Sequence, residues 1–153
     1  MDIFRINQAA TLLVSGEIDD WERVRAQRVD TVIDMDGDVD FGLPKTPGAM
    51  LYVYYPIFDE DLPDLPKLDA LGRMVAELIE AGRVVLVHCH MGFNRSMLVA
   101  ATALSYLGLC GPDILAHMRQ VRPGALFNER FAEHVNTLPA RRIRLEVLKD
   151  PSK

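Results

Sequence analysis

One stretch of this chain, Val84–Ser96, limits what it can fold into more than any other. It opens with four apolar residues, Val84–Val87, which are too few for a helix and typical of a buried strand. A short polar segment follows, and the apolar run Met97–Leu107 then has the composition of a buried helix. A strand, a tight polar loop and a helix in this order are typical of an anion site at a helix N-terminus.

The residue types within the polar loop favour a phosphate as that anion. A loop that curls around a helix start directs several backbone N–H groups at one point, and Gly92 can adopt the positive φ that such a curl needs. Arg95 has a planar guanidinium that can hold two phosphate oxygens at once. Cys89 lies where the N–H groups converge, which favours the nucleophilic thiolate. Ser96 is placed to donate to the sulfur, and His88 to orient the loop.

The segment His88–Ser96 resembles the His-Cys-x5-Arg-Ser/Thr signature of the cysteine-dependent protein tyrosine phosphatase superfamily. The short chain looks most like the small, atypical dual-specificity phosphatases of that superfamily. The resemblance implies that Cys89 is the nucleophile and that Arg95 binds phosphate and stabilises the transition state. It also implies that no metal and no other cofactor is used. The loop residues that it assigns to substrate binding are His90, Met91, Gly92, Phe93, Asn94 and Arg95.

The same resemblance implies an α/β fold, in which a central, mostly parallel, twisted sheet of about five strands is flanked by helices. The residue patterns agree with such a fold. Strands are predicted over 4–14 (as a hairpin or edge strands with a turn at Ser15-Gly16), 29–35, 50–55 and 84–87. Helices are predicted from an Asp19 or Asp20 cap to Gln27 and over 66–81, 97–107, 112–120 and 128–137.

Phosphoryl transfer to a cysteine expels an oxygen that must be protonated, which calls for a carboxylic acid on a loop beside the phosphate site. The segment 56–66, PIFDEDLPDLP, supplies several acids. The family has its acid shortly after a strand and about 30 residues before the nucleophile, and Pro56–Asp59 resembles the Pro-Ile-x-Asp start of that loop. We therefore predict Asp59 as the general acid, with Asp61 as the alternative, and Asp64 as a helix cap.

Four aspartates alternate at the end of the predicted strand over 29–35: Asp34, Asp36, Asp38 and Asp40. A calcium loop of the EF-hand type would need glycine at its sixth position and glutamate at its twelfth. The chain has Val39 and Lys45 there, so we predict a solvated acidic loop instead. The segment Gly37–Ala49 is rich in turn-forming residues and is expected to be irregular and to border the substrate cleft.

The C-terminal third adds one further resemblance. Arg122-Pro123, followed by Asn128, resembles an Arg-Pro-x-x-x-x-Asn segment that lies near the active site in this family. Arg122 is therefore expected to reach the site, to support the Asp59 loop or to form a surface ion pair. Cys110 is interpreted as a packed cysteine rather than as a redox partner of Cys89. The basic residues after Pro139 are read as a solvated end.

Length and composition restrict the setting in which this site works. The 153 residues predict a single catalytic domain, 1–153. A net charge of -5 makes nucleic acid an unlikely partner. The two cysteines form no disulfide framework, no signal pattern opens the chain, and no apolar run reaches the ~18 residues of a membrane span. We predict a cytoplasmic protein that makes no use of a membrane.

The predicted function is a protein phosphatase that acts on phosphotyrosine, with phosphoserine and phosphothreonine as further candidates. Three alternatives stay open. An RNA 5′-triphosphatase is suggested because Gly92–Arg95 looks like the loop of metazoan capping enzymes, although Met91 stands where those have histidine. A phosphoinositide phosphatase often carries a lysine within the loop, and residues 90–94 contain none. The last alternative is a phosphate-binding adaptor without turnover.

Overall fold

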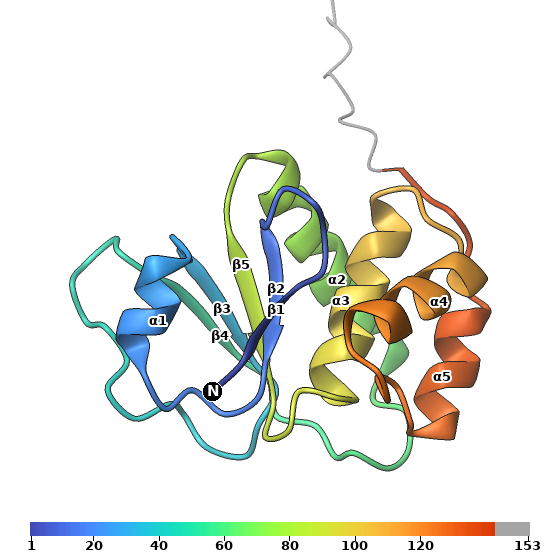
Figure 1. Cartoon of the computed structure of the whole chain (residues 1–153), viewed down its shortest axis with the longest axis horizontal. Helices are drawn as coiled ribbons and strands as arrows, with labels where there is room; N and C mark the ends of the chain where they lie inside the picture. Colours follow the sequence, from blue (N-terminus) through green and yellow to red (C-terminus); the bar gives the residue numbers. More distant parts are fainter. Residues whose placement is uncertain (143–153) are drawn as a thin grey trace, which may run out of the picture.

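The computed structural model describes residues 1–142, which are built around one five-stranded sheet (Figure 1). The strands lie in the order β1-β2-β5-β3-β4, and only β1 runs antiparallel to its neighbour. The predicted mostly parallel sheet of about five strands is thereby confirmed. The strands are β1 (Ile3–Arg5), β2 (Leu12–Ser15), β3 (Thr31–Asp34), β4 (Leu51–Tyr54) and β5 (Val85–His88).

Helices flank both faces of the sheet, with α1 on one face and the other four on the opposite face (Figure 1). The predicted caps are present: the side chains of Asp20 and Asp64 accept hydrogen bonds from backbone N–H groups of the first turns of α1 and α2. Asn128 caps α5 in the same way. The helices are α1 (Trp21–Ala26), α2 (Leu65–Glu80), α3 (Arg95–Tyr106), α4 (Gly111–Val121) and α5 (Glu129–Asn136). Among the described residues, no helix is long and apolar enough to cross a membrane.

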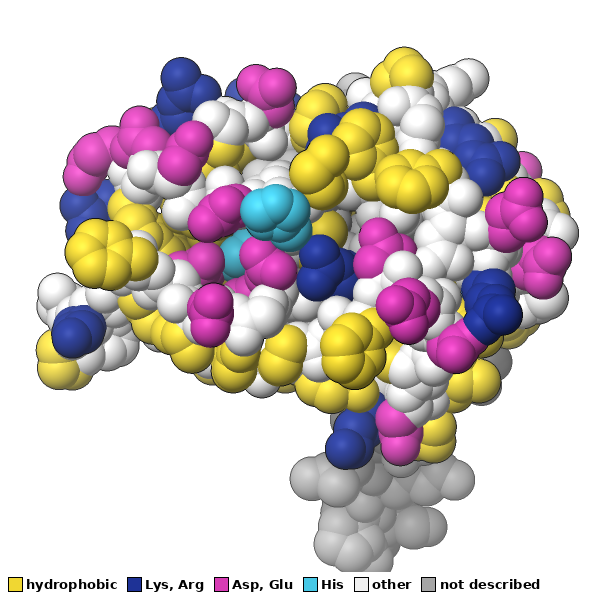
Figure 2. All heavy atoms as spheres, turned by 90° about the horizontal axis from the view of Figure 1, so that it is seen from below, with side chains coloured by type: hydrophobic (Ala, Val, Ile, Leu, Met, Phe, Trp, Pro, Cys, Tyr) yellow, Lys and Arg dark blue, Asp and Glu magenta, His cyan; other side chains and the backbone are white. Residues whose placement is uncertain are grey.

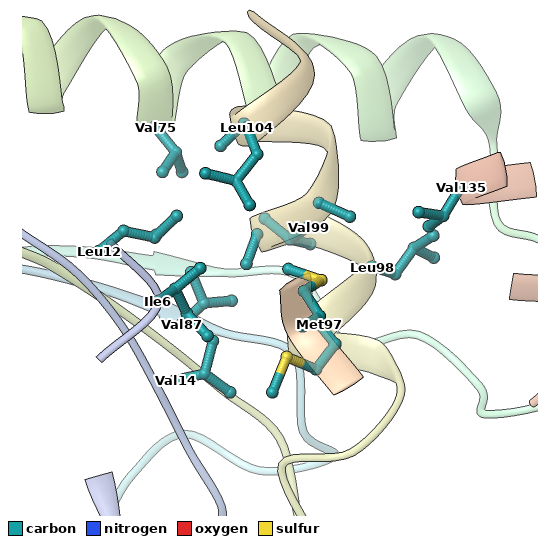
Figure 3. Close-up of a cluster of buried hydrophobic side chains, with 14 of the residues drawn as sticks. Ile6, Leu12, Val14, Val75, Val87, Met97, Leu98, Val99, Leu104 and Val135 are labelled. Carbon is teal, nitrogen blue, oxygen red and sulfur yellow. The ribbon is translucent and has the colours of Figure 1, made fainter. Parts of the chain in front are cut away.

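Alternating side chains of the buried strands serve two separate cores. On β2, Leu12 and Val14 face the helices α2 to α5, whereas Leu13 faces α1. Figure 3 shows α3 at the centre of the larger core, to which Val99 of α3 and Val87 of β5 both belong. Ten consecutive residues of α3 are buried, which confirms the central position that its apolar sequence predicts. α3 is thus held by packing along its length, and the short loop 89–94 joins the end of β5 to its N-terminus.

The N-terminal prediction is only partly correct. β1 and β2 form the expected hairpin, but β2 is an inner strand that lies between β1 and β5. Ser15 is the last residue of β2 instead of a turn residue, and the hairpin turn lies earlier, where the Asn7 side chain accepts hydrogen bonds from the N–H groups of Thr11 and Leu12. Of the basic C-terminal residues, Arg144 and Lys149 lie outside the described residues.

Candidate active site

The loop between β5 and α3, residues 89–94, is shaped by one glycine and closes over one sulfur atom. Gly92 has a φ of 72°, and a Cβ at this position would lie 2.7 Å from Arg122 and from the backbone of Ser15. The Gly92 N–H donates to Cys89 Sγ over 3.2 Å, and the Ser96 hydroxyl lies 3.3 Å from the same sulfur. Cys89 is 2% exposed, so it lies at the floor of the loop.

Every carbonyl of residues 90–93 accepts a hydrogen bond from outside the loop. The backbone N–H of Glu17 donates to the first of these carbonyls and that of Leu126 to the last. Arg122 Nη1 donates to the two between them, those of Met91 and Gly92, over 3.0 and 2.9 Å. With its carbonyls held on the outer side, the loop keeps the curled conformation that suits an anion inside it.

Arg122 itself is clamped between two aromatic rings. Its guanidinium carbon lies 3.6 Å from the centroid of the Phe93 ring and 4.4 Å from that of Phe4. Partial burial lowers the pKa of Arg122, although the charge of Cys89 opposes that effect. The expectation that Arg122 reaches the site agrees best with the structure, because its side chain supports the phosphate loop instead of the Asp59 loop or a surface ion pair.

Arg95 begins α3 and directs its guanidinium toward the loop that follows β4. Nη1 lies 3.4 Å from the carbonyl oxygen of Ile57 and 3.5 Å from Asp36 Oδ1. The Nε atom is buried and has no hydrogen-bond partner among the described residues. A buried donor without a partner costs free energy, and an incoming acceptor such as a phosphate oxygen would remove that cost by accepting a hydrogen bond from Nε.

Asp59 is tied to the phosphate loop, whereas Asp61 is not. The side-chain amides of Asn94 and Asn128 each donate to Asp59, one to each carboxylate oxygen, and both distances are 2.9 Å. Asn94 also accepts the backbone N–H of Asn128, so the three side chains form one network. Asp61 forms an ion pair with Arg130 and its side chain is 74% exposed. Of the two predicted acids, the structure brings Asp59 to the loop.

The prediction of a solvated acidic loop after β3 is wrong for three of its four aspartates. Asp34 is fully buried and the side chain of Asp40 is 7% exposed, and both turn toward His88 beneath the phosphate loop. Asp36 is also drawn in, beside Arg95. Only Asp38 of the four is exposed. The segment is irregular as expected, but a histidine and a tyrosine supply the buried polar partners that its sequence alone does not reveal.

The contacts among His88, Asp34, Asp40 and Tyr52 shift the pKa values of three of these side chains. Burial alone would lower the pKa of His88, but a 2.6 Å hydrogen bond to Asp40 and the charges of Asp40 and Asp34 raise it. Burial also raises the pKa of Asp34, although the hydrogen bonds that it accepts from Tyr52 and the Asp36 N–H oppose that shift. The pKa of Tyr52 is strongly raised by burial, so its hydroxyl stays protonated.

Acidic and apolar side chains surround the mouth of the loop. Figure 2 views the end of the molecule at which the parallel strands finish, and it shows acidic side chains gathered around histidine and one basic side chain. His90 Nδ1 lies 3.6 Å from Glu17 and 3.7 Å from Asp36. Three large apolar side chains next to site residues are exposed: Phe58, Met91 and Phe127.

Three contacts of the site were not predicted, and each had a partial sequence signal. Asn128 belongs to the Arg-Pro-x-x-x-x-Asn resemblance, yet its bond to Asp59 was not foreseen. The alternation of aspartates after β3 contained Asp36 and Asp40, which were expected to be solvated.

Cys110 precedes α4, beyond the end of α3 that is remote from Cys89; α3 is about 18 Å long at 1.5 Å per residue. The described arrangement therefore keeps the two cysteines apart.

Comparison with known proteins identifies relatives of this fold and site. The family described as "Polymorphic toxin system, DSP-PTPase phosphatase" matches residues 11–108. Mouse protein phosphatase Slingshot homolog 3 is 30% identical over 121 residues, which cover 76% of this chain and 18% of the relative. Human protein tyrosine phosphatase type IVA 3 is 33% identical over 97 residues, which cover 61% of this chain and 54% of the relative. The chain thus spans only part of the length of these relatives.

A solved structure agrees with these sequence matches. The crystal structure of Tk-PTP in the active form has a TM-score of 0.69 and 24% sequence identity, and the match covers 88% of this chain and 95% of Tk-PTP. The matched family segment contains β2 to β5, the phosphate loop and all of α3. The chain therefore belongs to the DSP-PTPase family, the dual-specificity branch of the cysteine-dependent protein tyrosine phosphatases.

Proposed function

We propose that this protein hydrolyses phosphotyrosine in proteins through a phosphocysteine intermediate, with phosphoserine and phosphothreonine as further substrates. The observation that carries the proposal is the position of one sulfur atom. Cys89 Sγ lies at the floor of a curled loop, accepts the Gly92 N–H, contacts Ser96 and precedes an arginine with an available buried donor. A thiol in such surroundings is suited to attack phosphorus.

In the first step, the Cys89 thiolate attacks phosphorus in line with the leaving oxygen. A sulfur–phosphorus bond forms, the bond from phosphorus to the tyrosine oxygen breaks, and Asp59 gives its proton to that oxygen. The loop N–H groups and the Arg95 guanidinium hold the three equatorial oxygens, on which the transition-state charge is spread. The two hydrogen bonds from Asn94 and Asn128 keep the Asp59 carboxyl group beside the loop during this step.

In the second step, water attacks the phosphocysteine. Asp59, now a carboxylate, takes a proton from the water, an oxygen–phosphorus bond forms and the sulfur–phosphorus bond breaks. Ser96 donates its hydroxyl to the departing sulfur, an assignment supported by the 3.3 Å separation between the two atoms. Inorganic phosphate leaves and the thiolate is restored, so no cofactor is consumed.

The surroundings of the loop support a phosphotyrosine substrate. Exposed Phe58, Met91 and Phe127 neighbour the proposed acid, the loop and the Asp59-binding asparagine, so an aromatic ring would find apolar contacts there. Glu17 and Asp36 add negative charge beside the loop. Like charges disfavour ligands with several phosphates, such as inositol lipids and RNA triphosphate ends.

The test of this function is hydrolysis of p-nitrophenyl phosphate near pH 6 by the wild type and by Cys89→Ser. We expect turnover by the wild type and a loss of about a thousandfold or more in the variant, because the nucleophile is gone. Matched phosphopeptides that differ only in phosphotyrosine, phosphoserine or phosphothreonine then rank the substrates. A folded, reduced wild type without activity would instead favour the adaptor, and a Cys89→Ser protein that kept its rate would overturn the nucleophile assignment.

A further inference from the structure

Four polar side chains beneath the phosphate loop take no part in the proposed chemistry. His88 Nε2 lies 2.6 Å from Asp40 Oδ2 and 3.5 Å from Asp34 Oδ1, and the Tyr52 hydroxyl contacts both carboxylates. His88 and Asp34 are fully buried, and the Asp40 side chain is 7% exposed. Burial of two acids in one place is costly unless their charges are compensated.

The contacts among the four groups allow shared protons to compensate these charges. Asp34 is on β3, Tyr52 on β4 and His88 on β5, and Asp40 comes from the loop before β4. The Tyr52 hydroxyl has one proton for two carboxylates and accepts the Asp40 backbone N–H over 3.0 Å. A proton on His88 would place a positive charge between the acids, and the raised pKa values of His88 and Asp34 agree with this arrangement.

The cluster connects two functional segments. His88 immediately precedes Cys89, and β3 pairs with β5 so that Asp34 lies opposite His88. Asp40 belongs to the same loop as Asp36, which contacts both Arg95 and His90. The contact between Asp40 and His88 therefore fastens the loop after β3 to the start of the phosphate loop.

We propose that Asp40 is a positioning residue that, through His88, fixes the entry of the phosphate loop and holds the Asp36 segment beside Arg95. For its kinetic readout, this inference rests on the proposed phosphatase function. Asp40 touches neither the reacting sulfur nor the proposed acid in the described contacts; it acts through the imidazole that comes directly before Cys89.

A proton explains the cluster better than a metal ion does. Ligand atoms of Asp34, Asp40 and His88 lie within 4.8 Å of one another, a spacing that a cation can also use. The 2.6 Å separation between Nε2 and Oδ2, however, is that of a charge-assisted hydrogen bond. A proton on Nε2 in this hydrogen bond leaves that atom without a lone pair for a metal.

The test compares Asp40→Asn with Asp38→Asn, which removes the same charge from an exposed position of the same loop. The first readout is the rate at which iodoacetamide alkylates Cys89 as a function of pH, followed by mass spectrometry of the Cys89 peptide so that Cys110 does not interfere. This readout needs no turnover. The second is the pH dependence of kcat and kcat/KM for p-nitrophenyl phosphate.

In Asp40→Asn, we expect the alkylation profile of Cys89 to move upward by about one pH unit and kcat/KM near pH 6 to fall about tenfold, because a unit corresponds to a tenfold change in thiolate fraction. Asp38→Asn should leave the alkylation rate of Cys89 at each pH, and kcat/KM near pH 6, within twofold of the wild-type values. Asp40→Glu, which retains the carboxylate, should recover part of the loss. An Asp40→Asn protein whose alkylation and pH–rate profiles equal those of Asp38→Asn would overturn the proposal.

Tyr52→Phe provides the test if Asp40→Asn does not fold. It removes only the hydroxyl that bridges the two carboxylates, and we expect a shift of the alkylation profile in the same direction, of about threefold in rate at pH 6. An unchanged profile in this variant would equally contradict the proposal. If the wild type lacks turnover, the proposed function fails, but the alkylation comparison still decides the role of Asp40.

Discussion

At the scale of single residues, the clearest division is between two aspartates that lie two positions apart. Asp59 accepts hydrogen bonds from two asparagines, whereas Asp61 faces solvent and pairs with Arg130. We expect Asp59→Asn to lower kcat for phosphotyrosine by about 10²–10⁴-fold, because its basic leaving oxygen needs a proton. The loss should be smaller for p-nitrophenyl phosphate, whose leaving group is stable as an anion. Steady-state kinetics on both substrates measures the difference.

Asp61→Asn is the matched control, since it removes the same charge from the same loop at an exposed position. Its kcat should stay within about twofold of the wild type, as is usual for exposed ion pairs. Equal losses on the two substrates in Asp59→Asn, or a large loss in Asp61→Asn, would contradict the assignment of the acid.

The residues of the site differ in how far the sequence can predict them. Cys89, Arg95 and Ser96 are close neighbours in the chain, so the strand-loop-helix pattern alone brings them together. Asp59 is bonded to Asn94, 35 positions away, and to Asn128, 69 positions away, and no local sequence pattern spans such separations. The family resemblance suggested Asp59 by its spacing, but only the folded chain reveals the two amides that hold it.

At the scale of the element, the phosphate loop depends on one side chain from outside it. Arg122 donates to two loop carbonyls and stacks on Phe93, a combination that needs a planar guanidinium. We expect Arg122→Lys to destabilise the protein by about 1–3 kcal/mol, because a point charge cannot reproduce both hydrogen bonds and the stacking. Urea unfolding measures the stability, and KM for p-nitrophenyl phosphate should rise.

Arg83→Lys serves as the control for that change. Arg83 is an exposed arginine two residues before β5, at the end of the strand that is remote from Cys89. Its substitution should alter stability by less than about 0.5 kcal/mol, as is usual at the surface. The proposed role of Arg122 would be untenable if the two variants had the same stability and the same KM.

The elements themselves follow well from local patterns, with one instructive failure. Apolar residues at helical spacing predict α2, and the apolar composition of α3 predicts its burial, because both patterns depend only on near neighbours. The aspartates after β3 were expected to be solvated because charged side chains usually are. Asp34 and Asp40 are buried since Tyr52 and His88 come from two other strands to meet them.

At the scale of the whole molecule, the order of the strands could not be read from the sequence. β2 and β5 are separated by some seventy residues and two other strands, yet they lie side by side. The parallel pairing of β2, β5 and β3 puts their carboxyl ends at one edge of the sheet, where ligands bind in open α/β sheets. This arrangement brings the loop before β4 beneath the phosphate loop, so folding itself assembles the Asp34–Asp40–His88 cluster.

That coupling between folding and the cluster gives a pH dependence of stability. The folded-state pKa of His88 lies above its unfolded value of 6.5, so His88 contributes stability that is fully present below pH 6.5 and lost as the pH rises through the folded pKa. The Asp40 carboxylate is the main cause of that increase. Asp40→Asn should therefore destabilise the protein more at pH 5.5 than at pH 8.5, because the favourable charge pair exists only while His88 is protonated.

Urea unfolding of the wild type and Asp40→Asn at the two pH values measures this difference. Titrating groups outside the cluster cancel, since both proteins share them. His134, whose pKa burial lowers, and Asp69, whose pKa falls because hydrogen bonds from Tyr106 and Arg141 outweigh its burial, change stability equally in both proteins. Asp38→Asn should show the same small effect at both pH values. If Asp40→Asn costs the same free energy of unfolding at pH 5.5 and 8.5, His88 is not held as an imidazolium by Asp40, and the buried cluster must be neutralised by a proton on a carboxyl group alone.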